Sequence, residues 1–408
     1  MERIAQTYRD NQALVWVCVL IFVNQLGFGS IVPVVPLYAQ EFGVSSTAIG
    51  LTIAIYGAAR FLMNVPTGQI ADRFGRRAAL ASGGAITVGG NLVCALADSY
   101  WLFLGGRFIA GAGAAMVITG TQIVVADLSV PANRGRLMSI YQGTFLFAVG
   151  LGPLPGGFLA EYFSLSTPFF LYSILGAGVT ALAWTRIPET RGRDAEGGIL
   201  TSSGVSFRKQ LRLFSAQIGF VLVAIVSFTA FFARTGALFN LIPTLADSKL
   251  GLTPGQIGIG LALISIVGLT LAYPSGMLVD RFGRKSVIVP STLISGGSMV
   301  MFALAPSFLW FILSCFAWAV AIGISGPAPA AYAADSAPPG MNASAMGMYR
   351  MLADAGYVAG PLFLGAAADI LTTETALYIT GSMVVASGIL FALLAPETYR
   401  REKPSPQT

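Results

Sequence analysis

The sequence predicts an all-α membrane protein with twelve transmembrane helices, arranged as two pseudo-symmetric six-helix halves. Apolar residues make up 55% of the chain and charged residues only 10%, whereas soluble domains carry about 25% charge. Apolar runs of roughly 20 residues, enough to cross a bilayer, recur along the chain. One motif also returns 208 residues later, at Gly68 and at Gly276, which indicates a duplicated half.

Each apolar run is expected to be a helix, because lipid cannot satisfy free backbone groups. The first run is too long for the apolar core of a signal peptide, so it is expected to be a span. In chain order the predicted spans are approximately 14–38, 48–70, 79–97, 101–126, 137–160, 168–187, 214–245, 256–279, 286–304, 308–333, 345–370 and 375–395.

The repeat predicts the domain organisation. The segment GQIADRFGRR, residues 68–77, returns as GMLVDRFGRK, residues 276–285. We expect an N-terminal half at 1–187, a polar linker at 188–213 and a C-terminal half at 214–408. Other pairs follow the same shift: Asp127 and Asp335, Gly152-Pro153 and Gly360-Pro361, and Pro188-Glu189-Thr190 and Pro396-Glu397-Thr398.

Charges between the spans predict the orientation. Nearly all loop arginines and lysines fall on one side of a twelve-span arrangement, and the opposite loops hold Lys249 alone. The positive-inside rule then places both termini in the cytoplasm and the spans in the cell (inner) membrane. The net charge of +6 reflects this orientation, so lipid is an expected partner and nucleic acid is not.

Few residues suit a metal, a cofactor or an enzyme reaction. Histidine is absent, and Cys18, Cys94 and Cys315 lie inside apolar runs, where cysteine behaves as a small hydrophobe. No cofactor, metal site or enzyme activity is expected.

Three motifs make the chain resemble the major facilitator superfamily over essentially its full length. GQIADRFGRR matches the motif that this superfamily carries between helices 2 and 3. LGGRFIAGAGAA, residues 104–115, resembles its arginine motif in helix 4. VGLGPLPGG, residues 149–157, is similar to the helix-5 motif of the twelve-span drug:proton antiporter branch. The resemblance implies a transporter of small molecules, and a monomer is expected.

The duplicated motif predicts a gate at the cytoplasmic surface. Carboxylates and guanidiniums there can pair and hold that side shut, and Asp127 is expected to favour the positive N-terminal end of helix 11. The alternative is that these charges only fix the topology. The predicted gating residues are Gly68, Asp72, Arg73, Gly75, Arg76, Arg77, Asp127, Asp280, Arg281, Gly283, Arg284 and Asp335.

Glycines and prolines inside helices 5 and 11 predict bends. Proline costs about 3 kcal/mol in a soluble helix interior, whereas a membrane bundle tolerates it as a kink with close packing. Bending at the interface between the halves is the functional interpretation, and plain packing is the alternative. The predicted bend residues are Gly152, Pro153, Gly156, Gly157, Gly360 and Pro361.

Polar and ionisable residues in mid-membrane predict the substrate site, because such residues are costly there and by default face a polar interior. Several of them recur every four residues along helix 2, which gathers them on one face. The ionisable ones have no charged counterpart 208 positions away, as expected if they serve a substrate. The predicted substrate-binding residues are Arg60, Arg234, Tyr56, Asn64, Asn24 and Gln25.

Asp354 is the predicted proton carrier, because it is the only acid near mid-bilayer. Arg350 lies one helical turn before it, at ion-pair spacing. Arg107 joins the predicted coupling set because its helix-4 motif is tied to proton transfer in the branch that the chain resembles. The alternatives are a neutralised Arg350–Asp354 pair and structural roles for Arg60 and Arg107.

The prediction is therefore a secondary active transporter for proton-coupled efflux of small organic molecules by alternating access. Many exporters of cationic drugs carry a carboxylate in helix 1, but residues 22–36 (FVNQLGFGSIVPVVP) have none. The positive interior favours a substrate with a negative or electron-rich group. The alternatives are a facilitator or symporter for an organic anion or metabolite and, more remotely, a lipid-handling membrane protein.

The topology is testable with single cysteines on a background that lacks the three native ones. A membrane-impermeant maleimide added to intact cells should label Lys249→Cys and leave Val205→Cys unlabelled, because the latter lies in the predicted cytoplasmic linker. Labelling of position 205 with protection of position 249 would contradict the orientation.

Overall fold

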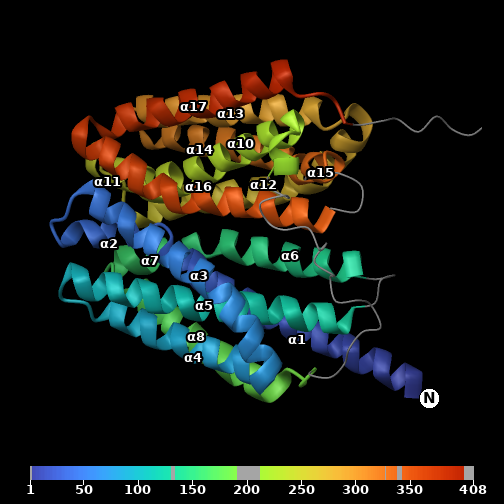
Figure 1. Cartoon of the computed structure of the whole chain (residues 1–408). Coiled ribbons are helices and arrows are strands. Elements are labelled where there is room, and N and C mark those ends of the chain that lie inside the picture. Colours follow the sequence, from blue (N-terminus) through green and yellow to red (C-terminus); the bar gives the residue numbers. More distant parts are fainter. Residues whose placement is uncertain (1, 130–133, 191–211, 327, 338–341, 399–408) are drawn as a thin grey trace, which may run out of the picture.

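The computed structural model describes residues 2–129, 134–190, 212–326, 328–337 and 342–398 (Figure 1). These residues form helices and no strand. Twelve helical stretches in them are long and apolar enough to cross a membrane, which confirms the predicted all-α membrane class. Most of the predicted linker lies outside the described residues.

The two halves contain similar series of helices. The N-terminal half contains α1 (Glu2–Ile31), α2 (Val35–Glu41), α3 (Ser46–Phe74), α4 (Arg76–Ala95), α5 (Tyr100–Leu128), α6 (Arg134–Leu151), α7 (Pro153–Tyr162) and α8 (Thr167–Arg186). The C-terminal half contains α10 (Ile218–Phe232), the π-helix η1 (Ala233–Leu241), α11 (Ile242–Leu250), α12 (Pro254–Phe282), α13 (Lys285–Leu304), α14 (Phe308–Ser325), α15 (Ala328–Asp335), α16 (Asn342–Ile370) and α17 (Thr373–Leu394).

Four predicted spans differ from single straight helices. The first is divided by a turn that contains Pro33, which has no N–H to continue the helical ladder. The fifth is divided at Gly152, directly before Pro153. The tenth is divided at Gly326, whose φ of 41° belongs to the left-handed region. The seventh extends to Leu250 through the π-helix. Hydropathy alone does not reveal these breaks, because the residues on both sides are apolar.

The two halves lie side by side, one above the other in Figure 1. Between them, α3 packs against α16, and α12 packs against α6 and α7. We call the end of the bundle with the α3–α4 and α12–α13 links the terminal end, since α1 begins and α17 ends there, and the end with the α2–α3 and α11–α12 links the opposite end. Close backbone contacts between the halves, such as Gly50 with Pro361 and Gly157 with Pro254, lie toward the opposite end.

Glycines allow the closest helix contacts. A Cβ at Gly156 would overlap the carbonyl oxygen of Ser30 on α1, and one at Gly157 would lie 2.5 Å from the carbonyl oxygen of Pro254 on α12. Among the predicted bend positions, the chain breaks its helix at Gly152, whereas α16 continues without a break through Pro361. A hinge role for these residues stays a prediction.

The packing predicts the effect of a single methyl group. Gly156→Ala should destabilise the protein by about 1–3 kcal/mol, because α1 and α7 must move apart to accept it. Gly178→Ala on α8 is the matched control, since no atom lies within 4 Å of the added carbon. Thermal unfolding of the purified protein should show a lower Tm for Gly156→Ala only, and equal Tm values would contradict the contact.

Candidate functional site

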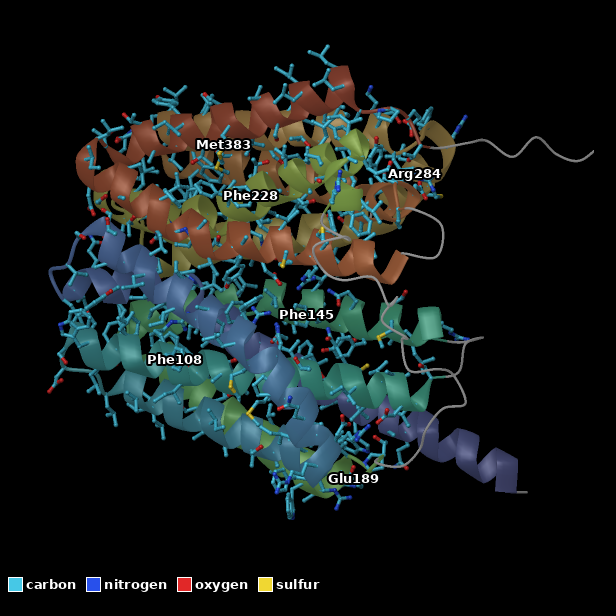
Figure 2. The ribbon with its side chains drawn as sticks, in the orientation of Figure 1. Phe108, Phe145, Glu189, Phe228, Arg284 and Met383 are labelled. Carbon is cyan, nitrogen blue, oxygen red and sulfur yellow. The ribbon has the colours of Figure 1, made fainter. Side chains whose placement is uncertain are left out.

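A cavity of about 440 Å³ lies between the two halves. Its walls come from α1, α3 and α6 of one half and from α10, η1 and α16 of the other. Phe145 of α6, labelled in Figure 2, is one of the residues that line it. Six predicted site residues come together here: Gln25, Arg60, Asn64, Arg234, Arg350 and Asp354.

The lining of this cavity is positively charged. It holds three arginines, Arg60, Arg234 and Arg350, and one acid, Asp354, which leaves an excess of two positive charges. Nε of Arg350 lies 3.5 Å from Oδ1 of Asp354, one turn along α16. No ion pair joins Arg60 or Arg234 to another described residue. An arginine at the bilayer centre costs about 2.5–3.5 kcal/mol on insertion scales, and both side chains are half-buried at the cavity wall.

Aromatic rings cover much of the remaining wall. The guanidinium carbon of Arg60 lies 6.0 Å from the centre of the Tyr357 ring, and that of Arg234 lies 5.4 Å from the centre of the Phe239 ring. Such contacts stabilise a cation by roughly 0.5–2 kcal/mol but leave its N–H donors free. The rings in the wall are Phe28, Phe61, Phe145, Phe231, Phe239 and Tyr357. None of these aromatic residues was predicted as part of the site, although Phe61, Phe231 and Phe239 lie close in sequence to the interior arginines.

The π-helix places Arg234 at the cavity. Pro361 on α16 has no N–H for the carbonyl of Tyr357 four residues earlier, and the hydroxyl of Thr235 donates to that carbonyl at 3.0 Å. Nδ2 of Asn240 donates to the carbonyl of Pro361 at 3.4 Å. The wider turn of η1 therefore fits against the proline in α16. π-helical turns are rare and often mark functional sites.

A smaller pocket of about 40 Å³ adjoins the cavity and shares Val149, Arg234 and Phe239 with it. Trp318 of α14 lines this pocket and is only 2% exposed. Its Nε1–H has no acceptor among the described residues. Sequence analysis missed Trp318, because one tryptophan in an apolar run carries no pattern.

Three predicted site residues lie away from the cavity lining. Arg107 is buried behind α3, where its guanidinium carbon lies 4.4 Å from the centre of the Tyr56 ring. Its Nε donates to the carbonyl of Thr52 at 3.2 Å. Asn24 is buried as well and donates to Oε1 of Gln25 at 2.8 Å. These contacts join the three residues to α3 and to Gln25, behind the lining, and a role for them in transport stays a prediction.

At the terminal end of the N-terminal half, charged residues of the repeated motif connect the α3–α4 link, the end of α5 and the segment that follows α8. Arg76 lies 3.1 Å from Oδ1 of Asp72 and 2.9 Å from Oδ2 of Asp127. Glu189 accepts from the backbone N–H groups of Arg76 and Arg77, at 2.9 and 3.2 Å. These bonds lie within one half, and no atom lies within 4 Å of a Cβ built at Gly68.

The C-terminal half repeats this network. Nε of Arg284 lies 3.0 Å from Oδ2 of Asp335, and Glu397 accepts from the N–H groups of Arg284 and Lys285 at 3.2 and 3.1 Å. Figure 2 labels Glu189 and Arg284, one from each network. Gly75 and Gly283 hold the matching turns at φ of 99° and 90°. The side chain of Asp280 lies outside the described residues.

The predicted gate therefore has two separate parts in this conformation, one within each half. Asp127 contacts Arg76 at 2.9 Å and the hydroxyl of Thr190 at 2.6 Å. Among the described residues it forms no hydrogen bond or ion pair with α16, which is the eleventh span and the partner that the sequence predicted. Closure of the cytoplasmic side by these residues stays a prediction for another conformation.

Two carboxylates join the halves at the opposite end. Asp369 of α16 accepts hydrogen bonds from the first residues of α3, and Glu161 of α7 accepts them from the start of α12. Neither was predicted as a site residue. Their spacing of 208 residues is the signal that could have found them.

Comparison with known proteins agrees with this architecture. The family model of the Major Facilitator Superfamily matches residues 17–247 and 223–408. Multidrug resistance protein 1 of Bacillus subtilis is 25% identical over 397 residues, 95% of this chain and 98% of that protein. Tetracycline resistance protein, class H, of Pasteurella multocida is 22% identical over 96% of this chain and 97% of its own length. A crystal structure of a POT family transporter in complex with 5-aminolevulinic acid has a TM-score of 0.77 at 14% identity, covering 95% of this chain and 96% of that one.

Proposed function

The chain belongs to the major facilitator superfamily, as a multi-pass membrane transporter and not an enzyme, and on that premise we propose that it exports small organic molecules in exchange for protons. The observation that carries this proposal is the cavity between the halves. It holds one acid, Asp354, and two arginines that form no ion pair with another described residue. Two relatives named for resistance to drugs support export.

The arrangement of contacts supports alternating access. The halves contact each other toward the opposite end, where α3 meets α16 and α7 meets α12. With the predicted cytoplasmic termini, the cavity between them opens inward in this conformation. Rocking of the halves about the cavity would then expose the same site to the outside.

Asp354 is suited to couple protons to this cycle. It lines the cavity beside Arg350, so both the substrate and the neighbouring cation act on its charge. Protonation of Asp354 removes one negative charge from the lining, and release of that proton restores it. A proton and a substrate can therefore exchange within one site.

A second candidate function is facilitation or symport of an organic anion. The excess of positive charge in the lining favours it. The two functions differ in whether a pH gradient drives net movement outward from the cytoplasmic face.

The proton coupling is testable in proteoliposomes. Asp354→Asn should abolish substrate movement driven by a pH gradient, because the amide neither gains nor loses a proton near neutral pH. Substrate exchange without a gradient should remain, since it needs no net proton movement. Asp98→Asn, at an exposed acid of the α4–α5 link, is the matched control. Full gradient-driven transport by Asp354→Asn would remove this residue from the mechanism, and no gradient dependence in the wild type would favour the facilitator.

A further inference from the structure

The cavity and the smaller pocket meet at Arg234 and present hydrogen-bond donors that have no acceptor among the described residues. Arg234 lines both spaces, and Arg60 lines the cavity beside the Tyr357 ring. Trp318 lines the smaller pocket with its buried Nε1–H unpaired among the described residues. A buried donor without an acceptor costs about 1–3 kcal/mol. A ligand group with several acceptor atoms, bound next to Arg234, would therefore remove this cost.

We propose that the substrate is an amphiphilic organic anion, whose acidic group binds Arg60 and Arg234 and accepts the N–H of Trp318. This inference rests on the proposed transport function and names its substrate class. A carboxylate or sulfonate presents several acceptor oxygens, and the guanidinium fork suits such groups better than an ammonium does.

Charge in the cavity excludes a cation as the preferred substrate. Asp354 is the only acid in the lining and is engaged by Arg350 at 3.5 Å. A cationic ligand would add to an excess of two positive charges in an apolar surrounding. An anion reduces that excess and replaces the water that the guanidiniums lose.

The aromatic residues of the cavity lining indicate that the part of the ligand away from its acidic group is apolar. Phe28, Phe61, Phe145 and Phe231 add apolar surface to the lining of the cavity. A ring system buried there would contribute roughly 25 cal/mol for each Å² of apolar area removed from water. The expected ligand thus has a flat apolar body with one acidic group at its edge.

Three probes of equal shape test the charge preference: 2-naphthoate, 2-naphthamide and 2-naphthylmethylammonium. Binding to the purified full chain should be at least tenfold tighter for naphthoate than for the other two. Arg234→Gln should weaken naphthoate binding roughly tenfold or more, because hydrogen bonds to charged groups are lost. Trp318→Phe, which removes the indole N–H and leaves a smaller aromatic ring, should weaken naphthoate binding severalfold and naphthamide binding less.

Controls separate the binding site from general loss of structure. Arg186→Gln removes an arginine that also contacts an aromatic ring, Trp16 at 4.9 Å, but lies outside the cavity, and it should bind naphthoate normally. Arg234→Lys keeps the charge without the fork and should give an intermediate loss.

Two results would overturn the anion site. One is tightest binding of the ammonium, or binding of none of the three probes. The other is unchanged naphthoate affinity in both Arg60→Gln and Arg234→Gln. Binding needs no gradient, so failure of proton coupling is seen separately.

A second inference comes from the opposite end. Oδ1 of Asp369 accepts the N–H of Ser46 at 2.6 Å, and Oδ2 accepts the N–H and the hydroxyl of Thr47 at 2.8 and 2.5 Å. A carboxylate of the C-terminal half thus caps the N-terminus of α3 in the other half. Helix N-termini are positively polarised and favour such groups.

A matching contact runs in the other direction, from the N-terminal half to a helix of the C-terminal half. Oε2 of Glu161, in the N-terminal half, accepts the hydroxyl of Thr253 at 3.0 Å and the N–H of Gly255 at 3.1 Å, at the N-terminus of α12. Glu161 and Asp369 are 208 residues apart, so the pair follows the internal repeat. We infer that these two carboxylates form a symmetric latch, which keeps the opposite end closed until the halves rock.

Spin labels across this end test the latch. On a background lacking the native cysteines, labels at Glu41→Cys and Leu371→Cys report the separation of the halves in the full chain. Asp369→Asn and Glu161→Gln should each raise the ratio of open to closed populations about two- to fivefold, and the double variant should raise it further.

Two control variants show whether the change in distance comes from the lost carboxylate of the latch. Asp98→Asn changes an exposed acid at the same end and should leave the distances unchanged, as should Asp369→Glu, which keeps the charge. A double variant with the wild-type distance distribution would overturn the latch.

Discussion

Among the described residues, the closest backbone contacts between the halves lie toward one end of the bundle, and the remaining architecture depends on them. In lipid no hydrophobic force drives helices together, so small residues and interhelical hydrogen bonds must hold them. Gly50 approaches the carbonyl of Pro361, and Gly157 approaches that of Pro254. Because the halves meet there, the space farther along α3 and α16 stays open as the cavity. The carboxylate caps at the helix N-termini add directional bonds to this contact.

The chemistry of the cavity follows from placing charge in an apolar interior. Arg60 and Arg234 rest against aromatic rings, which leave their N–H groups free. Arg350 and Asp354 form a pair whose acid can change its charge. The same cavity therefore contains the excess positive charge and the single acid on which the proposed exchange of protons and small molecules depends.

The internal repeat separates scaffold from site. The networks around Arg76 and Arg284, and the caps at Glu161 and Asp369, occur once in each half. Each of these contacts supports a helix end that both halves need. The charged residues of the cavity have no charged counterpart 208 positions away, as expected if they serve the proposed substrate, whose two sides need not be alike.

The sequence by itself determined the twelve spans, the two halves and six residues of the cavity, because length, hydropathy and rare ionisable groups in apolar runs are local features. It did not separate Arg60, which lines the cavity, from Arg107, which lies buried against Tyr56, since both are arginines in spans. Only the tertiary structure distinguishes the two arginines, because it shows which face of α3 and of α5 lies toward the cavity. The π-helix at Arg234 and the pocket at Trp318 were decided in the same way. The π-helical turn fits against the Tyr357 carbonyl on α16, which Pro361 leaves without a backbone N–H donor. The pocket is lined by residues of α6, α7, α12, α14 and η1, so the partners of both features are distant in the chain.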